Sequence, residues 1–271
     1  MNGDSIALGF ALALYLAGAV VLGANLFLRR PALLVAGRVL AILAVAFHGG
    51  AIGLRCAELR QAPFANPAET LSLLSWMITL AYLASEVIWR LSAAGPFALG
   101  MSFLLVMGAS LAPSARAAST PALLATGAIS LHITAIIAAF GAFALAFCCA
   151  AFYLIEHHIL KSKQNLVWMK RLPPLVTVES AAFSLVAFGF PLLTLGILAG
   201  LLSALRGNLG AYWYRDTFIV LAFVVWATYG LYLLARLAAN WPPIRTAYVL
   251  LVGQALCLLL FFIPSGVHRF G

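Results

Sequence analysis

A short aromatic and charged stretch, Leu-Gly-Ala-Tyr-Trp-Tyr-Arg-Asp at residues 209–216, lies between two long apolar segments of the chain. Tyr212 and Trp213 provide flat apolar rings, while Arg215 and Asp216 provide one charge of each sign. Aromatic faces pack against a flat ligand, and an arginine pairs with its carboxylates. The stretch therefore predicts a binding surface for a flat, charged molecule such as haem.

Two histidines are candidate ligands for the iron of such a molecule. His132 lies about two turns into an apolar segment, where a polar group is costly unless it serves a site or forms a hydrogen bond with a neighbouring helix. His268 lies close to the C-terminus, where a solvated tail is the simpler interpretation. Two imidazoles on opposite faces of a porphyrin would ligate its iron axially. Both interpretations stay open for each histidine.

A third histidine, His48, lies inside another apolar segment and is followed by two glycines. These small residues would allow a neighbouring helix or a flat ligand to approach closely. His48 is therefore either a weaker candidate for haem binding or the site of a hydrogen bond between helices.

Three acidic residues lie near the ends of apolar segments. Asp216 opens a segment, so its carboxylate is predicted to cap the free N–H groups of a helix. Glu69 is predicted to cap in the same way, and Glu86 is predicted to pair with Arg90, four residues further along.

The elements that must position these residues are membrane helices. Hydrophobic residues make up 65% of the 271, charged residues only 8%, and the mean hydropathy is +1.08; this composition excludes an ordinary soluble domain. The net charge of +9 comes from basic residues placed singly or in short groups at segment ends, which argues for lipid contacts and against nucleic acid. The four cysteines form no C-x-x-C motif.

The predicted fold is all-α, a single transmembrane domain over residues 1–271. A span needs roughly 20 apolar residues. Eight segments qualify, at about 5–28, 35–56, 69–89, 96–113, 123–158, 178–204, 217–236 and 246–264.

The basic residues predict the orientation. With the N-terminus outside, ten of the 16 lysines and arginines lie on the cytoplasmic side, including all three lysines. An even number of spans then places both termini outside. This topology brings His132, His268 and the loop at 206–216 to the external face.

These residues resemble those of the cytochrome c assembly protein family, the haem-handling membrane proteins that include the CcsA, CcmC and HemX-like groups. The family's tryptophan-rich motif usually has the form Trp-Gly-x-Tyr-Trp-x-Trp-Asp. Gly210, Tyr212, Trp213 and Asp216 match it, while Leu209 and Arg215 replace the outer two tryptophans. The C-terminal Gly-Val-His-Arg-Phe-Gly is similar to the Gly-Leu-His-Ser-Tyr-Gly of many members.

Further matches extend the resemblance toward the N-terminus and are typical of the HemX-like branch. They lie at 64–76, 172–179 and 188–200. The resemblance implies a haem-handling core at about 123–271, axial ligation of haem b by His132 and His268, and packing of Tyr212 and Trp213 against the ring. It also implies contacts of Arg215 and Asp216 with propionates or the loop, and a bacterial inner-membrane location.

One departure from the family pattern bears on activity. Assembly synthetases carry a further histidine in the helix after the loop, where this chain has Leu234. The sequence therefore favours haem binding and delivery, with a membrane or periplasmic partner in cytochrome c biogenesis, over a complete haem lyase. The alternatives are a HemX-type scaffold or regulator that has lost haem, and, less well supported, a small-molecule permease.

Overall fold

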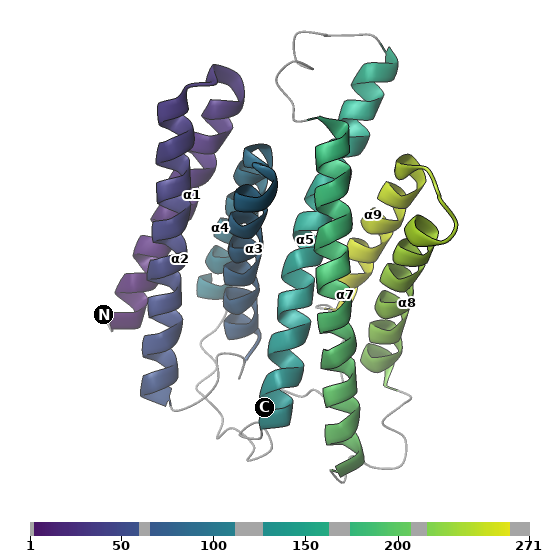
Figure 1. Ribbon diagram of the computed structural model, residues 1–271. Coiled ribbons are helices and arrows are strands. Elements are labelled where there is room, and N and C mark those ends of the chain that lie inside the picture. Colours follow the sequence, from purple (N-terminus) through teal and green to yellow (C-terminus); the bar gives the residue numbers. More distant parts are fainter. Residues whose placement is uncertain (1–2, 60–65, 112–126, 163–173, 207–215, 261–271) are drawn as a thin grey trace.

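The structure, a computed structural model, describes residues 3–59, 66–111, 127–162, 174–206 and 216–260, and over these residues the fold is all-α (Figure 1). The chain begins with α1 (Gly3–Leu28), α2 (Pro31–Leu59), α3 (Pro67–Trp89), the short 3₁₀ helix η1 (Ser92–Ala94) and α4 (Gly95–Leu111). It continues with α5 (Gly127–Ser162), α7 (Leu175–Arg206), α8 (Thr217–Leu237) and α9 (Pro243–Leu260).

Eight of these helices are long and apolar enough to cross a membrane, among the residues that the structure describes. Each overlaps one of the eight predicted spans, so the predicted fold class and number of spans are confirmed. Large apolar side chains on the outer faces remain exposed, for example Val20 of α1, Val35 of α2 and Leu234 of α8. In a bilayer these faces contact lipid rather than water, so their exposure on the protein surface carries no hydrophobic cost.

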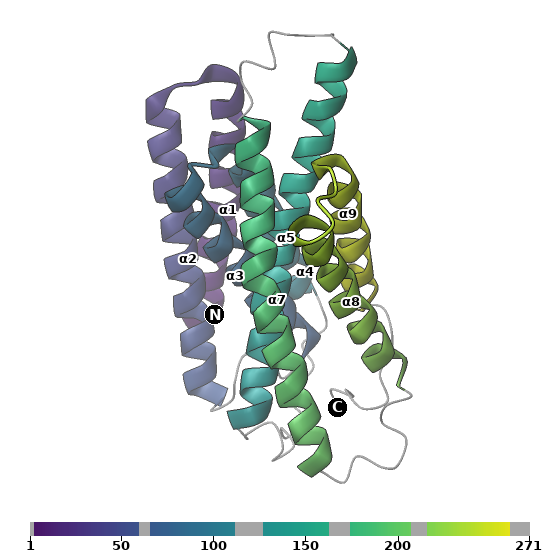
Figure 2. The same cartoon turned by 45° about the vertical axis from the view of Figure 1, so that its right-hand side comes forward.

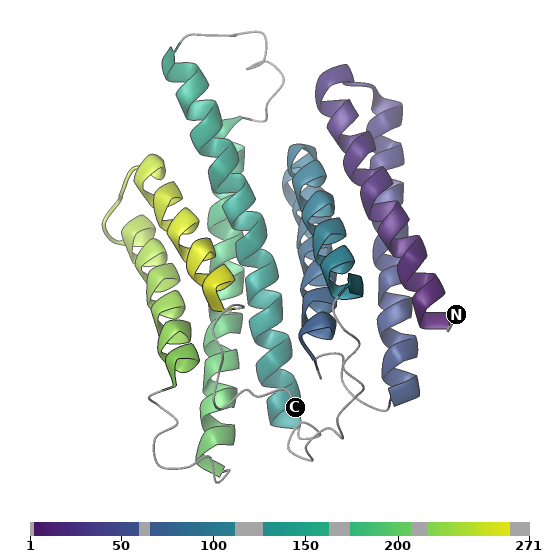
Figure 3. The same ribbon diagram turned by 180° about the vertical axis from the view of Figure 1, so that it is seen from behind.

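The helices form two groups that lie side by side (Figures 1 and 3). The first group packs α1 against α2 and α4, and α3 against α4; the second packs α5 against α7 and α9, and α8 against α9. Contact between α3 and α5 joins the groups, and the view in Figure 2 shows α5 and α7 between α3 and the pair α8 and α9. The haem-handling core predicted at about 123–271 contains the whole second group.

The ends of α3 show how local sequence sets helix boundaries. Asn66 is the N-cap, since its side-chain oxygen accepts a hydrogen bond from the Glu69 backbone N–H at 2.9 Å, and a proline follows it. The helix ends at Arg90, whose backbone is left-handed with φ 53° and whose N–H donates to the Glu86 carbonyl. The side chain that the structure shows capping α3 is thus that of Asn66, while the Glu69 carboxylate pairs with Arg55 of α2.

Candidate functional site

His132 lies near the start of α5 and packs against α7. Its Nδ1 lies 2.6 Å from the carbonyl oxygen of Gly196. A carbonyl can only accept, so Nδ1 carries the proton and Nε2 carries the lone pair. Histidines that ligate metals usually donate their other ring N–H in this way, often to a backbone carbonyl, which fixes the tautomer and the orientation of the ring. The bond therefore holds the imidazole in the Nδ1-protonated tautomer, which is the form that metal-ligating histidines have when they bind through Nε2.

Two glycines of α7 form the surface on which the His132 ring lies. A Cβ built on Gly200 would come within 2.5 Å of Cε1 and 2.6 Å of Nδ1 of His132, and one on Gly196 would lie 2.7 Å from Cγ1 of Ile136. Glycines four residues apart lie on one face of a helix and let two membrane helices approach closely. This Gly-x-x-x-Gly pair is what brings the α7 backbone within reach of the imidazole.

Asp216 is the N-cap of α8. Its Oδ1 accepts a hydrogen bond from the Phe218 backbone N–H at 2.9 Å, and its backbone is extended. The predicted cap is thus confirmed. The cap fixes where the aromatic stretch at residues 209–216 ends and α8 begins.

The other predicted haem contacts lie outside the described residues. These are Gly210, Tyr212, Trp213, Arg215 and His268. The segments that carry them leave from the C-terminal end of α7 and from α9, which runs toward the same end of the bundle as the start of α5 (Figures 1 and 3). Within the described part of the chain, no group of three or more His, Cys, Asp and Glu side chains is placed to hold a metal ion.

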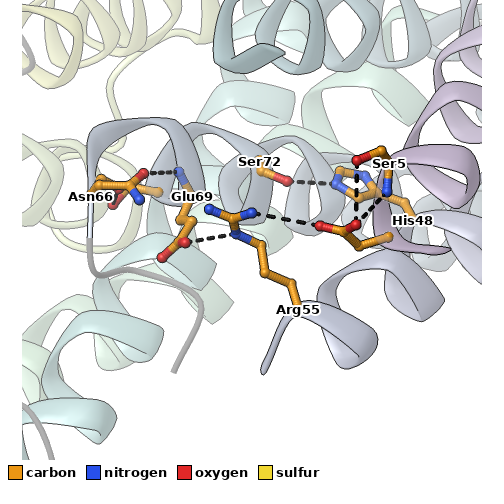
Figure 4. A network of polar contacts seen from close by, with 8 residues as sticks. Ser5, His48, Arg55, Asn66, Glu69 and Ser72 are labelled. Atoms are coloured by element: carbon orange, nitrogen blue, oxygen red, sulfur yellow. Dashed lines mark hydrogen bonds and ion pairs between the residues drawn. The ribbon is translucent and has the colours of Figure 1, made fainter. Parts of the chain in front are cut away.

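His48 lies in α2 and is fully buried. Its Nδ1 is 2.9 Å from the hydroxyl of Tyr15 in α1, and its Nε2 is 2.8 Å from the hydroxyl of Ser72 in α3 (the second contact appears in Figure 4). Each hydroxyl can donate or accept, so the neutral ring satisfies both nitrogens inside the protein. His48 thus links three helices, and iron ligation would require it to give up one of these bonds.

The contacts of His48 belong to a stripe of polar side chains along one face of α3. The stripe consists of Glu69, Ser72, Ser75, Thr79, Tyr82 and Glu86, spaced three or four residues apart. Thr79 and Ser102 of α4 share a hydrogen bond of 2.8 Å between their hydroxyls. The α3 polar stripe therefore faces α1, α2 and α4 and lies within the first helix group, away from His132.

Each end of the α3 polar stripe carries an ion pair. At one end Nε of Arg55 lies 2.8 Å from Glu69, and Nη1 of Arg55 lies 3.6 Å from Asp4 (Figure 4). At the other end Arg38 of α2 pairs with the buried Glu86. The prediction that Glu86 pairs with Arg90 is wrong, because Glu86 points toward α2 while Arg90 ends the helix.

Several residues of these sites had no sequence signal. Tyr15 and Ser72 are 33 and 24 residues from His48, so no local spacing indicates that they meet. The glycines at 196 and 200 could have been found from their spacing of four, which is typical of close helix packing, although nothing in that spacing names His132 as the partner.

The model of the family described as Cytochrome C assembly protein matches residues 64–268. The chain is 24% identical over 245 residues to the cytochrome c biogenesis protein CcsA of Guillardia theta, covering 81% of this chain and 80% of that relative. It is 27% identical over 176 residues to the protein HemX of Bacillus subtilis (strain 168), covering 65% of this chain and 63% of that relative. The CcsA of Chlorella vulgaris is 26% identical over 253 residues, covering 80% of each chain. The match spans α3 to α9 and includes the His132 site, and the chain is a multi-pass membrane protein that belongs to the cytochrome c assembly protein family.

Proposed function

We propose that this protein binds haem at the end of the second helix group where α5 begins and α7 ends, and that it delivers or retains that haem for the assembly of c-type cytochromes. The observation that carries the proposal is the 2.6 Å contact between Nδ1 of His132 and the Gly196 carbonyl. That bond holds the ring in the tautomer that ligates iron through Nε2. Relatives in the same family are named cytochrome c biogenesis proteins, which supports a role in the assembly of c-type cytochromes.

The chain's own residues would position the haem rather than react with it. His132 and His268 are the proposed axial ligands, and Tyr212 and Trp213 would pack against the ring. Arg215 would pair with a propionate. Non-covalent binding of this kind fits haem b.

Asp216 and Gly210 support the loop in this proposal. The Asp216 cap starts α8 at a fixed residue, and Trp213 precedes that residue by only three positions in the sequence. A glycine in the loop leaves its backbone free to approach a flat ring. In this proposal the two histidines ligate the iron, and the loop forms the surface that contacts the ring.

The proposed membrane is the bacterial inner membrane, with this end of the bundle outside and a membrane or periplasmic protein as the partner that receives haem. The charge distribution supports the orientation, since Lys161 lies in the last turn of α5, at the opposite end of the bundle, and the other two lysines follow it in the sequence before α7 begins. Reporter fusions to the termini test it: activity of a periplasmic reporter at both ends is expected.

The absorption spectrum of the purified protein tests the haem proposal. Protein from haem-replete cells is expected to show a Soret band that is lost in the His132→Ala, His268→Ala double variant. His158→Ala, an exposed histidine at the far end of α5, is the matched control and should keep the band. A colourless wild-type protein that also fails to bind added haemin would overturn the proposal and favour a HemX-type scaffold or regulator that has lost haem.

A further inference from the structure

A cleft lined by arginines opens at the opposite end of the bundle from His132. It has a volume of about 520 Å³, within the range of small-molecule sites. Arg29 and Arg30 contribute from the turn between α1 and α2, and Arg90 contributes from the end of α3. The lining of the cleft also includes Asn25 of α1, Trp89 of α3 and Thr177 of α7. The cleft therefore lies where both helix groups meet the head-group region of a bilayer.

The described residues that line the cleft include three arginines. All three arginines are exposed, and no aspartate or glutamate is among the described residues that line the cleft. The nearest carboxylate along α3, Glu86, is engaged by Arg38. Each arginine alone is explained by its position at a helix end, where a cation complements the helix dipole and the membrane topology. Those two effects do not require that three of them line one cleft.

Two of the arginines occupy backbone positions that normally suit glycine. Arg29 has φ 49° and Arg90 has φ 53°, and each donates its backbone N–H to the carbonyl four residues earlier, at 2.9 and 3.0 Å. Such left-handed helix ends usually carry glycine because a Cβ is crowded there. The chain thus keeps an arginine at both positions against the local backbone preference, and both side chains belong to the same cleft.

From this convergence we infer that the cleft binds the head group of an anionic phospholipid that carries two phosphates, such as diphosphatidylglycerol. Three guanidinium groups supply the bidentate donors that phosphate oxygens accept. Trp89 and Asn25 supply the amphipathic ring and the amide that suit the interface between head groups and hydrocarbon. Basic pockets between membrane helices recognise head groups of this type. A lipid seated here would contact the α1–α2 turn and the start of α7 together, and so hold the two helix groups against each other.

The test is a titration of the purified protein in neutral detergent with diphosphatidylglycerol. Bound lipid is counted by native mass spectrometry, and the thermal unfolding midpoint is measured in parallel. The key variant is Arg29→Gly with Arg90→Gly, because glycine relieves the left-handed backbone and should let the protein fold at least as well. Arg245→Ala is the matched control, an exposed arginine at the same end of the bundle but outside the cleft.

The wild type and the Arg245→Ala control are expected to bind diphosphatidylglycerol and to be stabilised by it. Phosphatidylcholine should neither bind to these proteins nor stabilise them. Loss of the two arginines should weaken binding about fivefold for each charge, or about thirtyfold together. Equal lipid binding by the double variant and the wild type would overturn the inference. So would equal stabilisation by inorganic pyrophosphate, because the ligand would then be a soluble anion. The haem absorption of the double variant is a separate measurement, since the cleft lies far along the bundle from His132.

Discussion

Replacing Gly200 by alanine tests whether α7 provides the surface that orients His132. The new Cβ would lie 2.5 Å from Cε1 and 2.6 Å from Nδ1 of the imidazole. Carbon atoms in favourable contact lie at about 3.5–4.0 Å, so the overlap amounts to roughly 1 Å. The ring has to move away from α7 by about that distance, or the two helices have to separate. Either movement stretches the 2.6 Å bond between Nδ1 and the Gly196 carbonyl.

The structure gives a magnitude for this change. Overpacking of a closely packed site costs about 1–3 kcal/mol. The lost hydrogen bond adds about 1 kcal/mol, and the better helix propensity of alanine returns about the same amount. The net loss of stability is thus about 1–3 kcal/mol. Disturbing the group that orients a metal-ligating histidine typically weakens metal binding 10- to 100-fold, so we expect a loss of haem affinity of about that size.

A haemin titration followed at the Soret band measures this loss. Gly230→Ala is the matched control, because a Cβ on Gly230 of α8 would lie 3.5 Å from the Phe190 ring, an ordinary contact. The control should titrate like the wild type, while the Gly200→Ala variant should bind haemin 10- to 100-fold more weakly. Wild-type affinity in the Gly200→Ala variant, together with loss of binding in His132→Ala, would refute the reasoning that the α7 surface orients the ligand.

Two further predictions concern the buried network and the helix cap. Tyr15→Phe leaves Nδ1 of His48 buried without its hydroxyl partner, so the unfolding midpoint in detergent should fall by the equivalent of about 1–3 kcal/mol. Tyr248→Phe, at an exposed position, is the control and should leave the midpoint unchanged. Equal midpoints for the two variants would contradict a role of Tyr15 in the buried network. Asp216→Ala removes the acceptor of the Phe218 N–H and should cost about 1 kcal/mol, measured by thermal unfolding, while Asp216→Asn should keep most of the stability; an equally large loss in both variants would count against capping.

The sequence predicted the parts of this fold that depend on neighbouring residues. Long apolar runs broken by proline, arginine and lysine predicted all eight spans, because a membrane helix must satisfy its backbone internally over its whole length. The Asp216 cap was predictable because it is also local: an N-cap side chain bonds the backbone two residues further along the same chain. Helix ends differ from the predictions by a few residues, as at α5, which begins at Gly127.

Pairings between helices were not predictable, and Glu86 shows why. The i, i+4 rule pointed to Arg90, which is adjacent on an ideal helix. In the structure Arg90 lies past the last turn with a left-handed backbone, and the face that carries Glu86 is turned toward Arg38 of α2. Which face of a membrane helix meets a neighbour depends on packing along the whole helix, and a spacing of 48 residues carries no local signal of that contact.

The two described histidines of the candidate sites show what the structure adds to a residue type. Both looked alike in the sequence, as single titratable groups inside apolar spans. Iron ligation by His48 would break a buried hydrogen bond to Tyr15 or Ser72, which costs about 1–3 kcal/mol for the hydroxyl left behind. Ligation by His132 through Nε2 would keep the bond from Nδ1 to Gly196 and use it. His132 keeps the hydrogen bond that orients its ring when it ligates through Nε2, whereas His48 would lose one of the two bonds that join α1, α2 and α3, and this favours α5 and α7 as the place of the proposed haem.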